Sequence, residues 1–522
     1  MDYIISPNWN SWLIAFLVIN LIHFLGTWKL YILAGRKAWE AAIPLYNVWV
    51  LLDIIKRSKK WMLILFIPIV APLMFAILWV ETARSFGKRD LIHALLCIFT
   101  LGFYLYYLNY IEKPAYTGPE ERVENLIASL LYAIILATIV HTFVIQPYTI
   151  PTSSMEKTLL VGDFLFVSKL NYGSRVPVTP VGIPFTQSSF FGKRSYVDKI
   201  RLPYFRFPSF EKVKKNDIVV FNYPMDPENL ALDRKTPYVK RCVGLPGETV
   251  EIKDGIVFTD GKEEVLPGDA QRQFNYEVYT GGQPLNVEML LEELKYLSAD
   301  DVKYGALGDQ PVYLFEGLTE EQATVLSKYP SVQKIIKSRP DPKLATGVAY
   351  NEDGSINEEN SVMPLDKGYT SFNLGPLQIP KKGDVIIPSK ENYYLYKDLL
   401  ERSEGKTVVK TANGYTIDGK SGPYTLSQDY YYMMGDNRDM SLDGRFFGFV
   451  GENHILGKPV FIWMSWFNMF SDGKANAPSK WKANWERFFT VPNNGEPNKT
   501  SYLWIGVLFL VWFFGWDFFK KK

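Results

Sequence analysis

The stretch that decides the fold of this chain is Pro151-Thr152-Ser153-Ser154-Met155, which begins shortly after a long apolar run, Leu126 to Val144, has ended. Proline restricts the backbone at the start of the stretch, and three hydroxyl side chains are grouped behind it. The apolar, alternating residues 164–167 then indicate a strand. Hydroxyl residues beside proline are most often found in ordinary loops. Ser154 therefore becomes a candidate nucleophile near a membrane surface only in combination with other motifs.

Two further stretches supply that combination. Residues 238–248 read YVKRCVGLPGE, a short β-type run that ends in a turn and places Lys240 among apolar neighbours. Residues 435–445 read GDNRDMSLDGR, and they lie between two apolar runs, 430–434 and 446–450, that we expect to be strands. Polar loops held between buried strands are common places for binding and catalytic residues. The sequence thus predicts one site built from three separate stretches.

In chain order, Ser154-Met155, the strand Asp217 to Phe221, Lys240-Arg241 and Gly435 to Arg445 resemble the motifs of type I signal peptidases. These are membrane-bound serine proteases that remove signal peptides from exported proteins. The resemblance covers roughly residues 120–260 and 366–470. Three positions depart from the family pattern, although none removes a group that the chemistry needs: Lys157 in place of proline, Ser153 in place of glycine, and Asn216 in place of glycine before the strand.

The resemblance implies a catalytic role for several residues. Ser154 would be the nucleophile and Lys240 the general base. Thr152 would form the oxyanion hole together with the backbone N–H of Ser154. Ser441 would orient the lysine amine through a hydrogen bond. Asp443 and Arg445 would form a supporting ion pair, and residues 436–439 would act as loop scaffolding.

The resemblance also implies how the substrate is held. The signal peptide would lie extended beside an exposed strand edge, and shallow apolar pockets would admit small side chains, typically alanine, at the first and third positions before the cut. The residues that match the pocket-lining positions of the family are Ile150, Met155, Leu159, Tyr238 and Val239.

The choice of base follows from chemistry as well. A serine hydroxyl needs a base to remove its proton, and the chain contains only four histidines. His23, His93 and His141 lie in apolar runs and His454 lies in a structural context, so both a Ser-His-Asp triad and a His/Cys metal site are disfavoured. A lysine acts as a base near neutral pH only if burial lowers its pKa to roughly 7–8. We expect neither a metal nor a cofactor.

Composition limits the class of protein. A chain of 522 residues should contain more than one domain, and a net charge of +2 gives no reason to expect nucleic acid as a partner. Aromatic residues at 15% and apolar residues at 47% are high values, and they concentrate at the two ends of the chain. The two cysteines, Cys97 and Cys242, lie in contexts that do not suggest a disulfide, although a large extracytoplasmic core needs none.

Several apolar runs have about the length of a membrane span, and Trp and Tyr crowd their ends. They are Trp12–Trp28, Trp61–Val80, Leu91–Leu108, Leu126–Val144 and Leu503–Phe519. The first run lacks the basic start and the cleavage site of a signal peptide. The shorter run Ala38–Ile55 contains Pro44, Asn47 and Asp53, which favours an interfacial or re-entrant segment over a tilted span.

Positive charges between the first two runs predict that this connection is cytoplasmic. Threading the chain from there places residues from about 147 to 500 on the outer, periplasmic or extracytoplasmic side of a bacterial plasma membrane, in a multi-pass protein. Arg84, Lys88 and Arg89 lie in a loop predicted to face outward and oppose this orientation, but they are outnumbered.

The predicted fold class is a multi-domain membrane protein in which helical transmembrane segments join a mostly β catalytic domain that carries an α-containing insertion. The predicted parts are a multi-span membrane domain (1–115), a transmembrane anchor (116–148), a β-rich peptidase domain (149–260 and 366–470), an inserted subdomain (261–365), a juxtamembrane segment (471–501) and a C-terminal transmembrane helix (502–519). The first part resembles a small membrane domain of bacterial proteins. It would serve as an extra anchor or, alternatively, in regulation or substrate delivery.

Two regions depart from a simple peptidase. Residues 175–210 are rich in Pro, Phe and Tyr, which suits an exposed apolar loop near lipid or, equally, one packed on the core. In the insertion, Asn286 is expected to cap a helix over 287–297, and Thr319 with Gln322 forms a capping box for a helix to about Lys328. The insertion would be structural padding or a platform for a substrate or partner.

These features lead to one hypothesis and two rivals. The hypothesis is a membrane-anchored Ser/Lys endopeptidase that cleaves preprotein signal peptides after small residues, with membrane lipid and the secretion machinery as partners. One rival is another Ser/Lys protease on a similar β fold, such as a self-cleaving repressor. The other is a catalytically idle membrane scaffold in which the insertion and the N-terminal domain bind partners.

Overall fold

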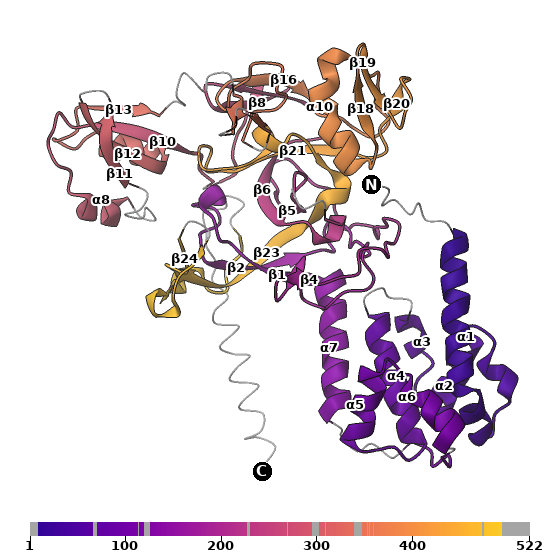
Figure 1. Ribbon diagram of the computed structural model, residues 1–522. Coiled ribbons are helices and arrows are strands. Elements are labelled where there is room, and N and C mark those ends of the chain that lie inside the picture. The colour runs from indigo at the N-terminus through magenta and orange to yellow at the C-terminus, as the bar shows by residue number, and fades with distance from the viewer. Residues whose placement is uncertain are drawn as a thin grey trace. The chain divides into compact units, whose positions relative to one another are not determined.

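A computed structural model describes residues 9–65, 70–112, 114–119, 126–226, 230–268, 270–294, 302–307, 310–338, 347–351, 353, 355–358, 360–471 and 474–492. These residues form two compact units (Figure 1). The first contains residues up to 144 together with 175–207 and 230–234, and the second contains 145–174, 208–229 and the chain from 235 onward. The predicted C-terminal span at 503–519 lies outside the described residues.

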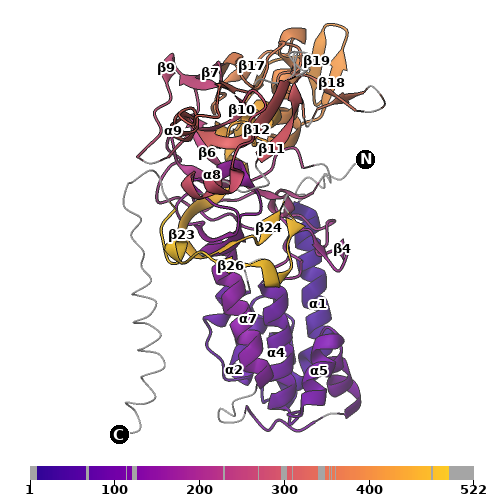
Figure 2. The same ribbon diagram turned by 90° about the vertical axis from the view of Figure 1, so that its left-hand side faces the viewer.

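The first unit is a group of helices, which Figure 2 shows lying along one another. Its elements are α1 (Trp9–Leu33), η1 (Ala38–Ala41), α2 (Tyr46–Ile54), α3 (Trp61–Ile64), α4 (Ala71–Ser85), α5 (Leu91–Phe99), α6 (Tyr104–Tyr107), η2 (Leu108–Glu112) and α7 (Leu126–Phe143), with the short strands β3 (Ser189–Phe190) and β4 (Lys193–Arg194). Large apolar side chains of α1 remain exposed, such as Ile14 (61%) and Leu21 (55%). A helix that is apolar on its outer face is suited to lipid.

Among the described residues, only α1 is long and apolar enough to cross a membrane as a straight helix, over Phe16–Leu33. The predicted span Trp12–Trp28 lies within it. The predicted span Leu91–Leu108 is not one straight helix, because α5 and the helical segment after it meet at 115°, as in a broken span or a re-entrant loop. Leu101 and Gly102 take positive φ at the bend, and a Cβ on Gly102 would fall 2.5 Å from the ring of Trp79.

The predicted run Trp61–Val80 is divided between α3 and α4, and residues 66–69 are not among the described residues. The predicted run Leu126–Val144 forms one helix, α7, of 18 residues. A multi-pass arrangement is therefore not established. The run Ala38–Ile55 forms only η1 and the short helix α2, and nine helical residues are too short to span a bilayer.

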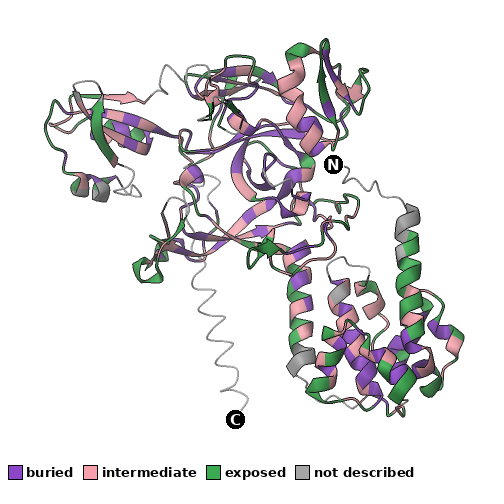
Figure 3. Cartoon of the chain, in the orientation of Figure 1, coloured by how far each residue is buried: buried purple, intermediate pink, exposed green. Residues whose placement is uncertain are grey.

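The second unit is built on an antiparallel sheet of eight strands in the order β1-β2-β23-β5-β6-β21-β22, with β26 also paired to β23. The strands are β1 (Ile145–Thr149), β2 (Asp163–Ser168), β5 (Ile218–Asn222), β6 (Pro237–Gly244), β21 (Tyr430–Met434), β22 (Val450–Gly451), β23 (Ile455–Phe467) and β26 (Lys482–Ala483). β5 and β21 are buried along their whole length, which explains their continuous apolar sequences (Figure 3).

Several smaller elements belong to the same unit. They are the sheet β16-β7-β8-β9 (Leu374–Gln378, Thr249–Lys253, Ile256–Thr259, Lys262–Glu263), the pairs β14-β15 (Ala349–Tyr350, Ile356–Asn357), β17-β20 (Val385–Ile386, Tyr424–Thr425), β18-β19 (Val408–Thr411, Gly414–Ile417) and β24-β25 (Phe470–Ser471, Lys474–Ala475), and the helices α10 (Tyr393–Asp398) and α11 (Gly444–Phe447). One cluster of buried side chains joins β7, β16 and β21 through Ile252, Leu377 and Tyr432.

The strand expected over Phe446–Val450 is wrong. The chain instead forms one helical turn, α11, because the Asp443 side chain accepts a hydrogen bond from the backbone N–H of Arg445 and caps that turn. Gly448 then takes φ 72°, and only the two residues of β22 pair with β21.

The insertion contains the two predicted helices and, in addition, a four-stranded sheet that was not predicted. Its strands pair in the order β11-β12-β10-β13 (Val302–Leu307, Gln310–Thr319, Gln273–Tyr279, Lys334–Lys337), beside α8 (Val287–Glu293) and α9 (Glu320–Leu326). The capping box of Thr319 and Gln322 is confirmed, and Asn286 does cap α8. The sheet was missed although residues 273–279 alternate buried and half-buried side chains from Phe274 on, which is the period of a strand.

The unit boundaries also differ from the predicted domains. Residues 175–207 belong to the helical unit, where Phe185 packs on His141 and Phe207 on Phe143 of α7. Many of their apolar side chains are exposed, including Phe191 (90%). The second segment of the peptidase domain was predicted to begin at residue 366. It begins earlier, because Val362 is already buried in the β core.

Candidate active site

Ser154 lies in a closed turn of the second unit. β1 ends at Thr149, a 3₁₀ turn contains Ser153–Met155, and β2 starts at Asp163. We call residues 150–163 the serine loop. Its ends are joined because Gly162 N–H donates to the carbonyl of Ile150 (2.8 Å) and Ile150 N–H donates to that of Asp163 (2.9 Å). Gly162 has φ +92°, and a Cβ there would fall 1.9 Å from the carbonyl oxygen of Trp466, so only glycine fits.

Lys240 reaches the serine loop from β6. Its strand pairs with β5, where Val219 lies opposite Lys240. The Lys240 Nζ lies 2.7 Å from the Oγ of Ser154. Both side chains are almost fully buried, with Lys240 exposed by 4% and Ser154 by 7%. The structure thus brings together two residues that are 86 positions apart in the chain, as the sequence predicted.

Burial lowers the pKa of the Lys240 ammonium to about 8, because a charged amine loses its hydration inside the protein. The carboxylates of Asp443 and Asp436 oppose this effect, and the guanidinium of Arg445 adds to it. A lysine with such a pKa is partly neutral near physiological pH. The arrangement can therefore remove a proton from Ser154, which an ordinary surface lysine cannot do.

The predicted ion pair between Asp443 and Arg445 is present, with Nε 2.9 Å from Oδ1. Burial disfavours the charged form of Asp443, but Arg445 outweighs this and holds the pKa of the carboxyl below its ordinary value. Asp443 also accepts a hydrogen bond from the backbone N–H of Gly435 (3.1 Å). The pair therefore fixes both ends of the 435–445 loop.

The residues expected to be scaffolding do hold the serine loop. Asn437 N–H donates to the carbonyl of Ser154 (3.2 Å), and the Asn437 amide donates to the carbonyl of Ser153 (3.2 Å). Asp436 accepts a hydrogen bond from the Thr158 hydroxyl (2.6 Å) and pairs with the fully buried Arg241 (2.6 Å). Arg241 follows Lys240 directly, so this ion pair connects the base, the 435–445 loop and the serine loop.

One predicted residue, Ser441, does not make the contact that was expected of it. The Oγ of Ser441 is buried and makes no hydrogen bond within the described residues, so the predicted bond to the lysine amine is not seen. It nevertheless lies near the site, because a Cβ on Gly435 would fall 2.2 Å from this oxygen and 2.5 Å from the carbonyl oxygen of Ser154. Thr152 is exposed in extended backbone, two residues before Ser154.

Four of the five predicted pocket residues share one apolar cluster: Ile150, Met155, Leu159 and Val239. Tyr238 lies apart from them, because successive strand residues point to opposite faces. Its ring stacks on Tyr223 with centroids 4.4 Å apart, and the Lys240 Nζ lies 5.5 Å from its centre. The apolar cluster therefore contains four of the five predicted pocket residues and lacks Tyr238.

Sequence reasoning missed Gln273, the first residue of β10 in the insertion. Its amide donates to the carbonyl of Glu156 (2.7 Å), and its backbone exchanges hydrogen bonds with Asp436 (3.0 Å) and Arg438 (2.9 Å). The insertion therefore begins inside the site. No local pattern marks a glutamine for this position, since its partners lie on two distant loops.

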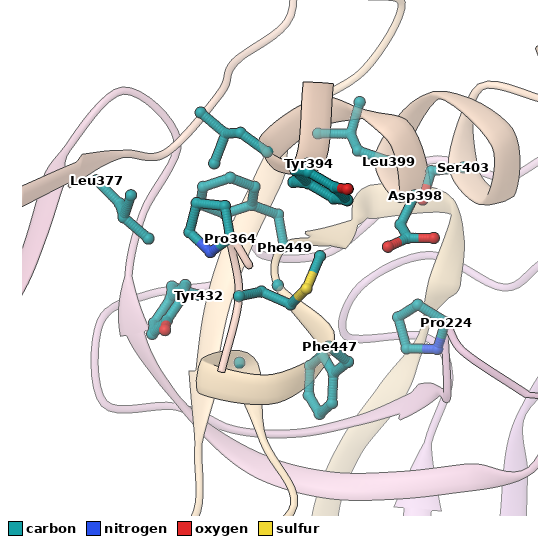
Figure 4. A pocket seen from close by; sticks show the side chains of 14 residues that line it. Pro224, Pro364, Leu377, Tyr394, Asp398, Leu399, Ser403, Tyr432, Phe447 and Phe449 are labelled. Atoms are coloured by element: carbon teal, nitrogen blue, oxygen red, sulfur yellow. The ribbon is translucent and has the colours of Figure 1, made fainter. Parts of the chain in front are cut away.

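A cavity drawn in Figure 4 lies elsewhere in the second unit. It is lined mainly by apolar side chains, and Gly444, Phe447 and Phe449 form part of its wall. Neither Ser154 nor Lys240 lines it. The cavity is therefore not evidence for a substrate pocket beside Ser154.

Comparisons with known proteins assign most of the chain to families. A family model described as "Signal peptidase, peptidase S26" matches residues 123–307 and 377–466, which is more than half of the chain. Signal peptidase I of Buchnera aphidicola subsp. Baizongia pistaciae is 26% identical over 68% of this chain and 81% of the relative. The corresponding values are 25%, 73% and 79% for Haemophilus influenzae, and 28%, 67% and 83% for Rickettsia typhi. Residues 39–119 match a family of unknown function.

Proposed function

This chain belongs to the signal peptidase family, peptidase S26, and we propose that it cleaves signal peptides from exported preproteins with Ser154 as nucleophile and Lys240 as general base. The observation that carries the proposal is the buried contact of 2.7 Å between Nζ and Oγ. This contact places a nucleophile next to a base of suitable pKa. The sequence has no histidine next to Ser154 or Lys240.

In the first step, the neutral Lys240 amine accepts the Ser154 proton while Oγ attacks the carbonyl carbon of the scissile peptide bond. The resulting ammonium then donates a proton to the leaving amine, and the acyl group stays on Ser154. In the second step, Lys240 accepts a proton from a water molecule as that water attacks the ester carbonyl. The C–O bond to Ser154 then breaks, the Lys240 ammonium returns its proton to Oγ, and the signal peptide leaves with a free carboxyl group. The same amine thus serves first as base and then as acid in each step.

The magnitude of the pKa shift decides whether this is feasible. With a pKa of about 8, Lys240 is neutral roughly a tenth of the time at pH 7, whereas an ordinary lysine is neutral less than about one time in a thousand. Burial therefore raises the population of the active base by about two orders of magnitude.

We assign the oxyanion hole to the backbone N–H of Ser154 and the hydroxyl of Thr152. Removing one such donor usually costs about 3–4 kcal/mol of transition-state stabilisation. The exposed position of Thr152 leaves its side chain accessible to a substrate. Ser441, Asp443 and Arg445 are assigned to support of the lysine, with Ser441 acting only once its hydroxyl turns to the amine.

The substrate would bind as an added strand. β1 stands at one end of the strand order, so one of its edges is unpaired within the described sheet, immediately before the serine loop. The apolar cluster of Ile150, Met155, Leu159 and Val239 lies beneath the same loop and would exclude large side chains by overlap. These features support cleavage after small residues of the Ala-X-Ala type.

We place the enzyme at the bacterial plasma membrane, with the catalytic unit on the outer side. The exposed apolar surface of α1 supports an anchor in lipid, and the positive charges that follow it support the orientation. We further propose that the chain crosses the membrane more than once and that it contacts the secretion machinery.

The test is cleavage of a preprotein with an Ala-X-Ala site by the full chain in detergent. We expect Ser154→Ala, Lys240→Ala and Lys240→Arg to lower kcat/KM by at least about 10³-fold, because each removes the nucleophile or the neutral base. A serine-reactive peptidase inhibitor should label the wild type but not Ser154→Ala. Retained cleavage in both lysine variants would place the base elsewhere, and an inactive wild type would favour a scaffold.

A further inference from the structure

We propose that Arg487 is a positioning residue for the nucleophile, and that residues 482–490, which follow the region matched by the peptidase family, are part of the catalytic unit. The inference rests on Ser154 being the nucleophile. It goes beyond the reaction itself, because residues 471–501 were expected only to lead to the membrane.

Residues 482–490 are attached to the central strand β23 at both ends. β26 pairs with it through Ala483 and Trp466, and Asn484 N–H donates to the carbonyl of Ser465 (2.9 Å). At the other end, Thr490 and Ile462 exchange two backbone hydrogen bonds, of 3.0 and 2.7 Å. The 3₁₀ turn Trp485–Arg487 is held between these points. The Arg487 side chain is therefore fixed at its base.

The guanidinium of Arg487 binds the serine loop in two places. Its Nε donates to Oδ1 of Asp163 (3.0 Å), and its Nη2 donates to Oδ2 of the same carboxylate. The Nη2 also donates to the backbone carbonyl of Thr158 (3.1 Å). Arg487 is 4% exposed and Asp163 is fully buried. One cation thus holds the middle and the end of the loop that carries Ser154.

The link from Thr158 to Ser154 is short. The backbone N–H groups of Thr158 and Leu159 both donate to the carbonyl of Met155, at 3.2 and 2.7 Å, and Met155 follows Ser154. Asp163 also accepts from the N–H of Leu160 (2.8 Å). A movement of Thr158 is therefore passed to the residue beside the nucleophile through two hydrogen bonds.

Removing Arg487 would leave the Asp163 carboxylate buried without a counter-charge, a condition that proteins relieve by rearranging or by admitting water. The serine loop is the part that would move, since β2 is held by strand pairing on both sides. A misplacement of about 1 Å at a reacting group costs on the order of 100-fold in rate. Within the described residues, no hydrogen bond links Lys240 to Arg487 or to Asp163. The pKa of Lys240 should therefore stay the same in the variant.

The experiment measures kcat per active site in the full chain in detergent, with sites counted by complete reaction with a serine-reactive peptidase inhibitor. We expect Arg487→Gln to lower kcat per site by about 100-fold, with the acid limb of the pH–rate profile unmoved. Arg487→Lys should retain part of the rate. The double variant Arg487→Gln with Asp163→Asn should recover activity over the single variant, because no unpaired charge remains. Glu486→Gln, an exposed neighbour in the same turn, is the matched control.

A purely structural role would lower the number of titrated sites but leave kcat per site at the wild-type value, and that result would overturn the proposal. If Arg487→Gln yields no titrated sites, Arg487→Lys decides: a reduced kcat per site supports the proposal, and a wild-type kcat per site overturns it. Failure of the dyad would instead appear as cleavage by Ser154→Ala, so the two failures are distinguishable.

Discussion

Two lysines of the catalytic unit, Lys235 and Lys240, lie five positions apart and are buried almost equally, with exposures of 7% and 4%. Burial lowers the pKa of each to about 8. Their partners differ. The Nζ of Lys235 donates to the backbone carbonyl of Pro224 (2.8 Å), whereas that of Lys240 meets the Ser154 hydroxyl (2.7 Å). Burial prepares an amine to act as a base, but only a partner with a proton to give makes it catalytic.

The most direct test of the difference between the two lysines is to remove each amine in turn. We expect Lys240→Met to lower kcat/KM for preprotein cleavage by at least about 10³-fold, because the Ser154 proton then has no acceptor. Lys235→Met, its matched control, should stay within about threefold of the wild type, because its partner is a carbonyl with no role in the reaction. A comparable loss in both variants would contradict the distinction drawn from their partners.

The second prediction separates the carboxylates that face each amine. The charge of Asp443 favours the ammonium form of Lys240, so Asp443→Asn should lower the pKa of Lys240 further. The acid limb of kcat/KM against pH should therefore move to lower pH by about one unit. The rate at the plateau should fall as well, because Asp443 also holds Gly435 and Arg445.

The control for this shift is Asp226→Asn, because Asp226 favours the charged form of Lys235 only. It should leave the acid limb where the wild type has it. If the limb moves to higher pH in Asp443→Asn, or moves equally in both variants, the titrating group is not Lys240.

The third prediction concerns stability and has the smallest effect. Since the folded pKa of Lys235 is about 8 and the ordinary value is 10.5, the unfolded state binds more protons between these values. The cost of burying the charged amine is present in full below pH 8 and disappears as pH rises toward 10.5. That cost is at most about 3 kcal/mol for this shift.

Melting temperatures of the wild type and Lys235→Met in detergent measure this cost. The wild type should gain stability relative to the variant between pH 7 and pH 10, because the variant has no amine to deprotonate. The variant also loses the hydrogen bond to Pro224. This loss lowers its stability equally at both pH values, so it does not affect the change in the stability difference between pH 7 and pH 10. A gap that does not change with pH would mean that the pKa of Lys235 is the same in the folded and unfolded states, which would contradict the prediction.

Much of the site was predictable because each part has a local signature. Ser154, Lys240 and the Asp443–Arg445 loop carry motifs that a linear sequence displays, and the capping box of Thr319 depends on residues only three apart. The sheet of the insertion was predictable in principle and was missed. The bend between α5 and α6 was not predictable from apolarity, since a straight and a bent segment bury the same residue types.

The sequence by itself determined which two residues we propose as the catalytic pair, the mostly β class of the unit that holds them, and the presence of apolar helices before it. Only the tertiary structure decided what keeps the nucleophile in place. Arg487 and Asp163 are 324 positions apart, and Gln273 reaches Glu156 from the insertion. The physical reason is that periodicity and turn chemistry act over a few residues, whereas the pairing of buried charges is selected only when the folded chain excludes water around both of them.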